Sequence, residues 1–221
     1  MSGEEGGLAR LAVKTVLITP SGALSPGPLS LSAIVAGAYL GWVGGVFVAL
    51  GHMAFELPFV FLLLKASSSI ELYIKRLYRP LTTAISLFIL YFSILSFEAA
   101  ARGPGAGNSA IPLEPSSYAT AFVIGVVLTG FNAHFLLWWV SVGFPLITGA
   151  ARSPPLGALV MYASHVWMDF AWLALLAGMG DVASTFAPAY RALMALVGLM
   201  LLLFAFDLLA RAWLGKRLLP L

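Results

Sequence analysis

The sequence lacks cysteine and glutamine altogether, and its asparagines are limited to Asn108 and Asn132. Without cysteine, the chain has no disulfide, no thiolate metal site and no thiol redox centre. Charge is also scarce, since 10% of the 221 residues are charged, whereas about a quarter are charged in soluble domains. The chain is 61% hydrophobic with a mean hydropathy of +0.97, which indicates an integral membrane protein.

The sequence contains long apolar segments that are candidates for membrane-spanning helices. A membrane-spanning helix needs about 20 apolar residues. Pro20, Pro26 and Pro28 interrupt the first such segment, and three prolines so close together cannot belong to one regular helix. We therefore expect two half-helices or a re-entrant segment there. The predicted fold is all-α, with six transmembrane helices over residues 10–38, 42–64, 80–97, 118–146, 156–177 and 190–210.

A polar connection rich in glycine, around Gly103 to Asn108, divides the chain into two halves of three spans each. The predicted organisation is a cytoplasmic tail (1–9), a first three-span repeat (10–97), an external connection (98–117), a second three-span repeat (118–210) and a second cytoplasmic tail (211–221).

The basic residues predict how the spans are oriented. Ten of the twelve lysines and arginines fall on the side that holds the N-terminus, including a basic loop at 65–79, and only Arg102 and Arg191 fall on the other side. An excess of basic residues marks the cytoplasmic side of a membrane. We therefore expect a multi-pass protein of the cell membrane with both termini cytoplasmic. The basic pI then reflects orientation and contact with lipid headgroups rather than a nucleic-acid partner.

Motifs in the first half recur in the same order in the second half. The middle span of each half carries a histidine and an acid four positions apart, His52 with Glu56 and His165 with Asp169. The third spans open with Tyr-Arg at 78–79 and 190–191, and they close with acid-x-x-x-Arg at 98–102 and 207–211. Because each half has three spans, the second half is inserted upside down. Inverted three-span repeats are a recurring design of secondary transporters.

The two histidine–acid pairs are candidate proton sites. A charged side chain at the centre of a span costs roughly 3 kcal/mol, so two such pairs indicate transport. Each pair shares one helix face, and histidine is the side chain that titrates closest to neutral pH. We expect His52 and His165 near the membrane centre, with Glu56 displaced toward the cytoplasm and Asp169 toward the outside, so that the four groups form a ladder for protons. Interhelical hydrogen bonding without transport is the alternative.

Four motifs together resemble the LysE/RhtB type of amino-acid exporter, in its archaeal form. They are Ser25-Pro26-Gly27-Pro28, Leu50-Gly51-His52-x-x-x-Glu56, the stretch 129–139 with Asn132 and Trp138-Trp139, and Ser164-His165-x-x-x-Asp169-Phe170-Ala171-Trp172. The resemblance covers nearly the whole chain. It implies proton-linked export of amino acids or similar small zwitterionic solutes, with no catalytic activity and no cofactor.

The broken first span is the expected substrate site. Pro26, Gly27 and Pro28 would frame the substrate with free backbone groups and a half-helix N-terminus that favours a carboxylate, and Asn132 would lie opposite. Ala133 stands where the family carries a proline, so we expect the fourth span to be less broken than the first.

Two further residues of the fourth span are candidates for the same site. His134 and Trp138 share a helix face and can line a pocket together. Trp138 and Trp139 can equally belong to the aromatic belt at the membrane interface. Gly37, Gly41 and Gly45 form a small-residue ridge, which indicates either a close helix contact or a homodimer face.

The main alternative is a divalent-cation exporter. His52, Glu56, His165 and Asp169 supply the nitrogen and oxygen ligands of a tetrahedral Zn²⁺ site. A thiol-electron carrier is excluded by the absence of cysteine. An intramembrane enzyme lacks a recognisable catalytic set, and a purely structural membrane protein leaves the buried acids unexplained.

Overall fold

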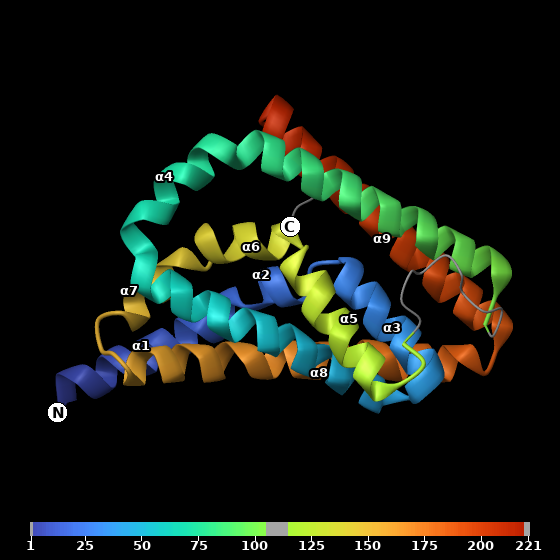
Figure 1. Ribbon diagram of the computed structural model, residues 1–221, viewed down its shortest axis with the longest axis horizontal. Coiled ribbons are helices and arrows are strands. Elements are labelled where there is room, and N and C mark those ends of the chain that lie inside the picture. Colours follow the sequence, from blue (N-terminus) through green and yellow to red (C-terminus); the bar gives the residue numbers. More distant parts are fainter. Residues whose placement is uncertain (1, 105–114, 219–221) are drawn as a thin grey trace.

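The computed structural model describes residues 2–104 and 115–218, without the side chains of residues 2–4, 66–77 and 133. Every regular element in these ranges is a helix, as predicted (Figure 1). In chain order the helices are α1 (Ser2–Ile18), α2 (Pro20–Ala23), α3 (Pro28–Leu40), α4 (Trp42–Arg102), α5 (Tyr118–Gly130), α6 (Ala133–Val140), α7 (Phe144–Ala150), α8 (Leu156–Ser184) and α9 (Ala187–Leu214).

Four stretches of the described chain are long and apolar enough to cross a membrane, namely Trp42–Lys65 and Tyr78–Arg102 within α4, together with α8 and α9. Two more pairs of helices qualify when each is joined across a break. The pair formed by α1–α2 and α3 is bent by 77°, and the pair formed by α5 and α6 is bent by 59°. The number of spans reaches the predicted six when each bent pair counts as one.

The first span breaks where the prolines stand. Pro20 and Pro28 occupy the first turns of α2 and α3, the position where a missing backbone N–H costs nothing. Between these helices Gly27 has an extended backbone, with φ −161° and ψ 174°, so the chain cannot continue as one helix. The predicted interruption of the first span, as two half-helices or a re-entrant segment, is confirmed. The first helix also extends further back than expected and begins at Ser2, within the predicted tail.

The fourth span is broken as well, although Ala133 was expected to keep it more regular. The break lies at Phe131 and Asn132, and it needs no proline because the Asn132 side chain caps the next half-helix. Its Oδ1 accepts hydrogen bonds from the backbone N–H groups of His134 (3.1 Å) and Phe135 (3.3 Å). Such a cap satisfies the free amides of a new helix start. The fourth span is bent less than the first, by 59° against 77°, as expected, but it is still broken without a proline.

The second and third spans form one helix. α4 remains helical through residues 65–79, where a loop was predicted, and Figure 1 shows it turning through a wide bend there. Its second half then runs antiparallel to α9 (Figure 1), and Ser93 Oγ donates a 2.8 Å hydrogen bond to the carbonyl of Gly198. The acid-x-x-x-Arg motifs at the ends of these spans form ion pairs, between Glu98 and Arg102 (3.6 Å) and between Asp207 and Arg211 (2.6 Å).

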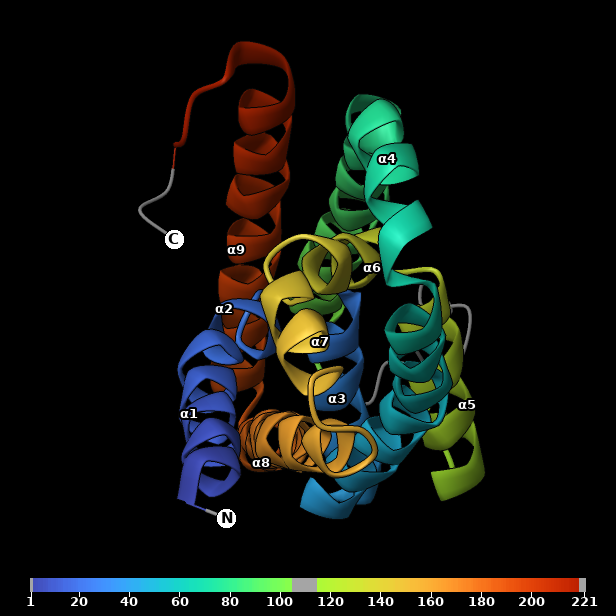
Figure 2. The same ribbon diagram turned by 90° about the vertical axis from the view of Figure 1, so that its left-hand side faces the viewer.

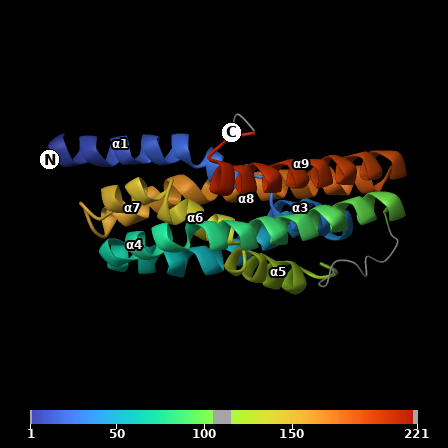
Figure 3. The ribbon, with the colours of Figure 1, turned by 90° about the horizontal axis from the view of Figure 1, so that it is seen from above.

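The apolar core has two parts. One part joins α3, α4, α8 and α9, and the other joins α1, the first half of α4, α6, α7 and the start of α8. In Figure 2, α8 is seen nearly end-on at the base, and α9 and the second half of α4 rise above it. Figure 3 shows α1 and α5 at opposite edges, with α6 and α7 between them. The space between the two apolar parts is where polar side chains gather.

Glycines allow the helices around this space to touch. A Cβ at Gly37 or Gly45 would collide with the α8 backbone, at Ala177 and Leu173 respectively. Gly41 ends α3 and precedes α4 with φ +66°, a conformation that favours glycine. The ridge therefore serves a helix contact within the chain, the first of the two uses expected for it. The homodimer stays a prediction.

Candidate functional site

One cavity is lined by every site residue that the sequence nominated. It has a volume of about 60 Å³, enough for a few water molecules or one polar end of a small solute, since a single water needs about 10–15 Å³. Both helix breaks face it, and a Cβ added to Gly27 would lie 3.9 Å from Asn132 Nδ2. The nominated residues that line it are Pro26, Gly27, Pro28, His52, Glu56, Asn132, His134, Trp138, His165 and Asp169.

The two histidine–acid pairs form a single cluster. His165 Nε2 lies 3.2 Å from Glu56 Oε1 and 3.2 Å from Asp169 Oδ2. His52 Nε2 lies 3.5 Å from Glu56 Oε1 and 3.9 Å from Asp169 Oδ2. All four side chains are buried, and Glu56 is fully so. The predicted ladder is therefore wrong, because α4 and α8 pack against each other and their side chains converge on one point.

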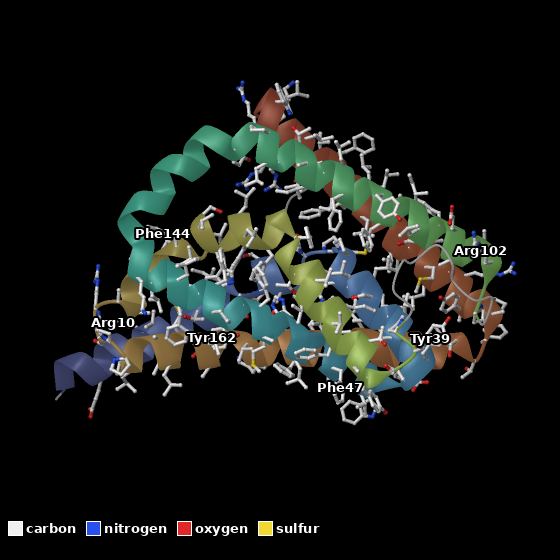
Figure 4. All side chains as sticks on the ribbon, viewed as in Figure 1. Arg10, Tyr39, Phe47, Arg102, Phe144 and Tyr162 are labelled. Carbon is white, nitrogen blue, oxygen red and sulfur yellow. The ribbon has the colours of Figure 1, made fainter. Side chains whose placement is uncertain are left out.

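Glu56 is the most strongly held member of this cluster. Its Oε1 accepts a 2.9 Å hydrogen bond from the indole N–H of Trp139, and its Oε2 accepts one of 3.2 Å from the Tyr162 hydroxyl. Tyr162 lies on α8, near the place where α1, α4 and α8 meet (Figure 4). Asp169 is held differently, because its buried Oδ2 accepts no hydrogen bond from any residue that the structure describes. Asp169 is thus the acid with spare capacity to bind a proton or a cation.

Each histidine is anchored on the broken span of the other half. His52 Nδ1 lies 2.9 Å from the hydroxyl of Thr129 in α5, and His165 Nδ1 lies 2.9 Å from the hydroxyl of Thr19 beside α2. Sequence reasoning missed both threonines, as it missed Tyr162. The available signal was the position of each threonine directly before a helix-breaking residue, Pro20 or Gly130, in an otherwise apolar span.

Trp138 joins the two broken spans. Its ring lies against Gly22, where an added Cβ would sit 2.7 Å away, and its N–H donates a 3.0 Å hydrogen bond to Ser21 Oγ. It also stacks on His165, with ring centroids 5.5 Å apart. Trp138 and Trp139 are both buried, so they belong to the site and not to an interfacial belt.

Two ends of the cavity differ in the charge they favour. The first turn of α3 presents backbone N–H groups of Leu29 and Ser30, and the N-cap Gly27 has no side chain to satisfy them. Helix N-termini attract anions. The cluster of Glu56 and Asp169 supplies carboxylates, which attract cations. Ligand atoms of His52, Glu56 and Asp169 also lie within 4.8 Å of one another, so these residues have the spacing to hold a metal ion.

The sequence matches one family model. The model of the LysE type translocator covers residues 20–212, which includes both helix breaks and the whole cluster. The chain belongs to the LysE type translocator family. Members of this family are transporters, which identifies a multi-pass membrane translocator and favours neither an enzyme nor the metal-exporter alternative. No curated protein and no solved structure gives a significant match to this translocator.

Proposed function

We propose that this translocator exports an amino acid, or a similar small zwitterionic solute, in exchange for protons. One observation carries the proposal: a single cavity combines an uncapped helix N-terminus with a pair of buried carboxylates and two histidines. A zwitterion has the complementary charges at its two ends. Broken helices that meet in the core of a membrane protein are a recurring form of substrate site.

In the proposed complex the substrate carboxylate lies at the start of α3. Pro26, Gly27 and Pro28 keep the chain out of helical geometry there, so the amides of the first turn stay free to donate. Asn132 faces Gly27 across the cavity, and Trp138 and His134 close its walls. Because the cavity holds only about 60 Å³, a complete amino acid requires this site to widen.

The substrate amine and the transported protons would use the same cluster. Asp169 Oδ2 lies beside both histidines and accepts no hydrogen bond among the described residues, so it can receive an ammonium group. His52, Glu56 and His165 complete a set that can carry protons when the substrate is absent. Export of the substrate would then be driven by protons entering from outside.

The proposal includes an inverted arrangement of the two halves, 10–97 and 118–210. It is supported by the reciprocal anchoring of the histidines, in which His52 contacts the broken span of the second half and His165 that of the first. A rotation of about 180° around an axis in the membrane plane would exchange the two pairs.

Counterflow tests the substrate. Purified protein in liposomes loaded with one unlabelled amino acid should accumulate the same labelled amino acid, and a panel of amino acids identifies which. Loading with Zn²⁺ or Mn²⁺ instead should give no metal counterflow. Accumulation of a metal but of no amino acid would reject the proposed function in favour of cation export.

The substitution Gly27→Ala should weaken transport without unfolding the protein. The new methyl group would meet only ordinary contacts, 3.9 Å from Asn132 Nδ2, but it would occupy the cavity. One misplaced methyl group in a binding pocket costs about 1–3 kcal/mol, so we expect the apparent affinity in counterflow to fall about tenfold or more. Gly7→Ala, which meets no atom within 4 Å and lies outside the cavity, is the control and should transport normally. Equal affinities in the two variants would place the substrate elsewhere.

The proposed orientation has both termini in the cytoplasm. The chain has no native cysteine, so single cysteines introduced at Ser2, Ser68 and Leu221 should react with an impermeant thiol reagent only from the cytoplasmic side. Cysteines at Asn108 and Ser184 should react only from outside. External labelling at Ser68 would contradict the six-span arrangement.

A further inference from the structure

We infer that Thr19 and Thr129 are positioning residues that force both histidines to carry a hydrogen on Nδ1, so that each Nε2 faces the carboxylates and shares a proton with them. The inference rests on the proposed function for its transport consequence, but its structural part stands on hydrogen-bond geometry alone.

The threonine hydroxyls determine which histidine nitrogen is protonated. A hydroxyl has one hydrogen to donate. Thr19 Oγ1 lies 2.8 Å from the backbone carbonyl of Thr15, and Thr129 Oγ1 lies 2.6 Å from that of Gly125. Because a carbonyl oxygen only accepts, each hydroxyl hydrogen is used there. The hydroxyl oxygen must then accept from the histidine, and the Nδ1 atoms at 2.9 Å must donate.

A hydrogen on Nδ1 determines the state of Nε2, the other nitrogen of each histidine ring. A neutral imidazole with a hydrogen on Nδ1 has a bare lone pair on Nε2. His165 Nε2 lies 3.2 Å from oxygens of both Glu56 and Asp169, where two unprotonated acceptors would repel each other. A proton must therefore occupy this gap, on the nitrogen or on a carboxyl oxygen. The same holds for His52 Nε2, which is 3.5 Å from Glu56.

Charge balance gives the number of protons. Among the described residues, the groups that face the two rings are Glu56, Asp169 and the other histidine, and Tyr162 donates to Glu56. His134 lines the same cavity, and its ring packs on Phe204. Two carboxylates with two shared protons form a neutral cluster, the state favoured in a low-dielectric interior. When a substrate ammonium group binds to the cluster and one proton leaves, the cluster stays neutral. The positive charge of the ammonium replaces that of the proton.

Each threonine lies on the half-helix that leads into a break, which links the proton sites to these two half-helices. Thr19 is a helical residue before α2, on the half-helix that ends ahead of Gly27, and Thr129 lies in the last turn of α5, ahead of the break at Phe131 and Asn132. A shift of either half-helix pulls its threonine away from the histidine. The ring is then free to turn, and its Nε2 no longer has to face the carboxylates.

Nitrogen NMR tests the tautomers directly. The chain has three histidines, so protein labelled with ¹⁵N only in histidine gives a simple spectrum in liposomes. We expect Nδ1 to be protonated in two of the three rings at every pH where the protein is folded. In Thr19→Val one of these rings should lose its fixed Nδ1–H signal, and in Thr129→Val the other should. Finding an unprotonated Nδ1 in both anchored rings of the unmodified protein would overturn the inference, whether or not any variant folds.

Transport supplies the second measurement. Thr19→Val and Thr129→Val should each lower pH-gradient-driven export at least about tenfold, because a histidine with the wrong tautomer cannot relay protons. Thr19→Ser and Thr129→Ser keep the hydroxyl and should restore both the Nδ1–H signal and transport. Normal gradient-driven export by the valine variants would reject the positioning role. Failure of the unmodified protein to exchange any amino acid would reject the proposed function and leave the tautomer result to stand by itself.

Discussion

The Asp169→Asn translocator should lose transport driven by a pH gradient and should keep substrate exchange when no gradient is applied. Asparagine has the shape of aspartate, and its amide N–H can donate to the bare His165 Nε2 that lies 3.2 Å from Asp169 Oδ2. The cluster therefore keeps its packing, but it can no longer take up and release a proton at this position. Exchange needs no net movement of protons, so it should continue, although at reduced apparent affinity for the amine.

The measurement compares two assays on the same liposomes, accumulation under an imposed pH gradient and counterflow without one. Asp181→Asn is the matched control, because Asp181 lies on the same helix, is exposed, and is not part of the cavity. Glu56→Gln should behave like Asp169→Asn, since it too removes one titratable group from the cluster. If both cluster variants accumulate substrate at normal rates under a pH gradient, the cluster is structural and carries no protons.

The Gly180→Ala substitution should destabilise the protein strongly, whereas Gly178→Ala, two residues earlier on α8, should not. A Cβ at Gly180 would collide with the backbone carbonyl of Ile34 in α3, and two packed helices have no flexible side chain there that could yield. Overpacking of this kind costs about 1–3 kcal/mol or more. At Gly178 the nearest atom is Trp42 Cβ at 3.8 Å, an ordinary contact. Alanine there gains up to about 1 kcal/mol in helix propensity.

Thermal unfolding in one detergent, followed by loss of monodisperse protein, measures both variants against the unmodified chain. The midpoint should fall for Gly180→Ala and should stay or rise for Gly178→Ala. Since α3 carries one wall of the cavity and α8 carries His165 and Asp169, Gly180→Ala should also reduce counterflow in the fraction that remains folded. Equal midpoints for the two variants would mean that α3 and α8 do not touch as closely as described.

Local sequence signals were sufficient for several features. Pro20, Pro26 and Pro28 predicted the broken first span, because proline lacks a backbone donor and three prolines so close together cannot fit inside one regular helix. Spacing alone placed His52 with Glu56 and His165 with Asp169 on common helix faces. Apolar runs of sufficient length determined the membrane class. None of these conclusions depends on how one helix lies against another.

The arrangement of the site was decided only by tertiary structure. Periodicity gives the face and the depth of a residue along its own helix, so it predicted a ladder. It contains nothing about the packing of α4 against α8, which brings each histidine within 3.9 Å of both carboxylates. Thr19 and Thr129 became visible only through the histidines that they contact from the opposite half. The span breaks at Asn132 because the side chain of this residue caps α6. The local sequence also allows a continuous helix there, so tertiary packing decides between the two conformations.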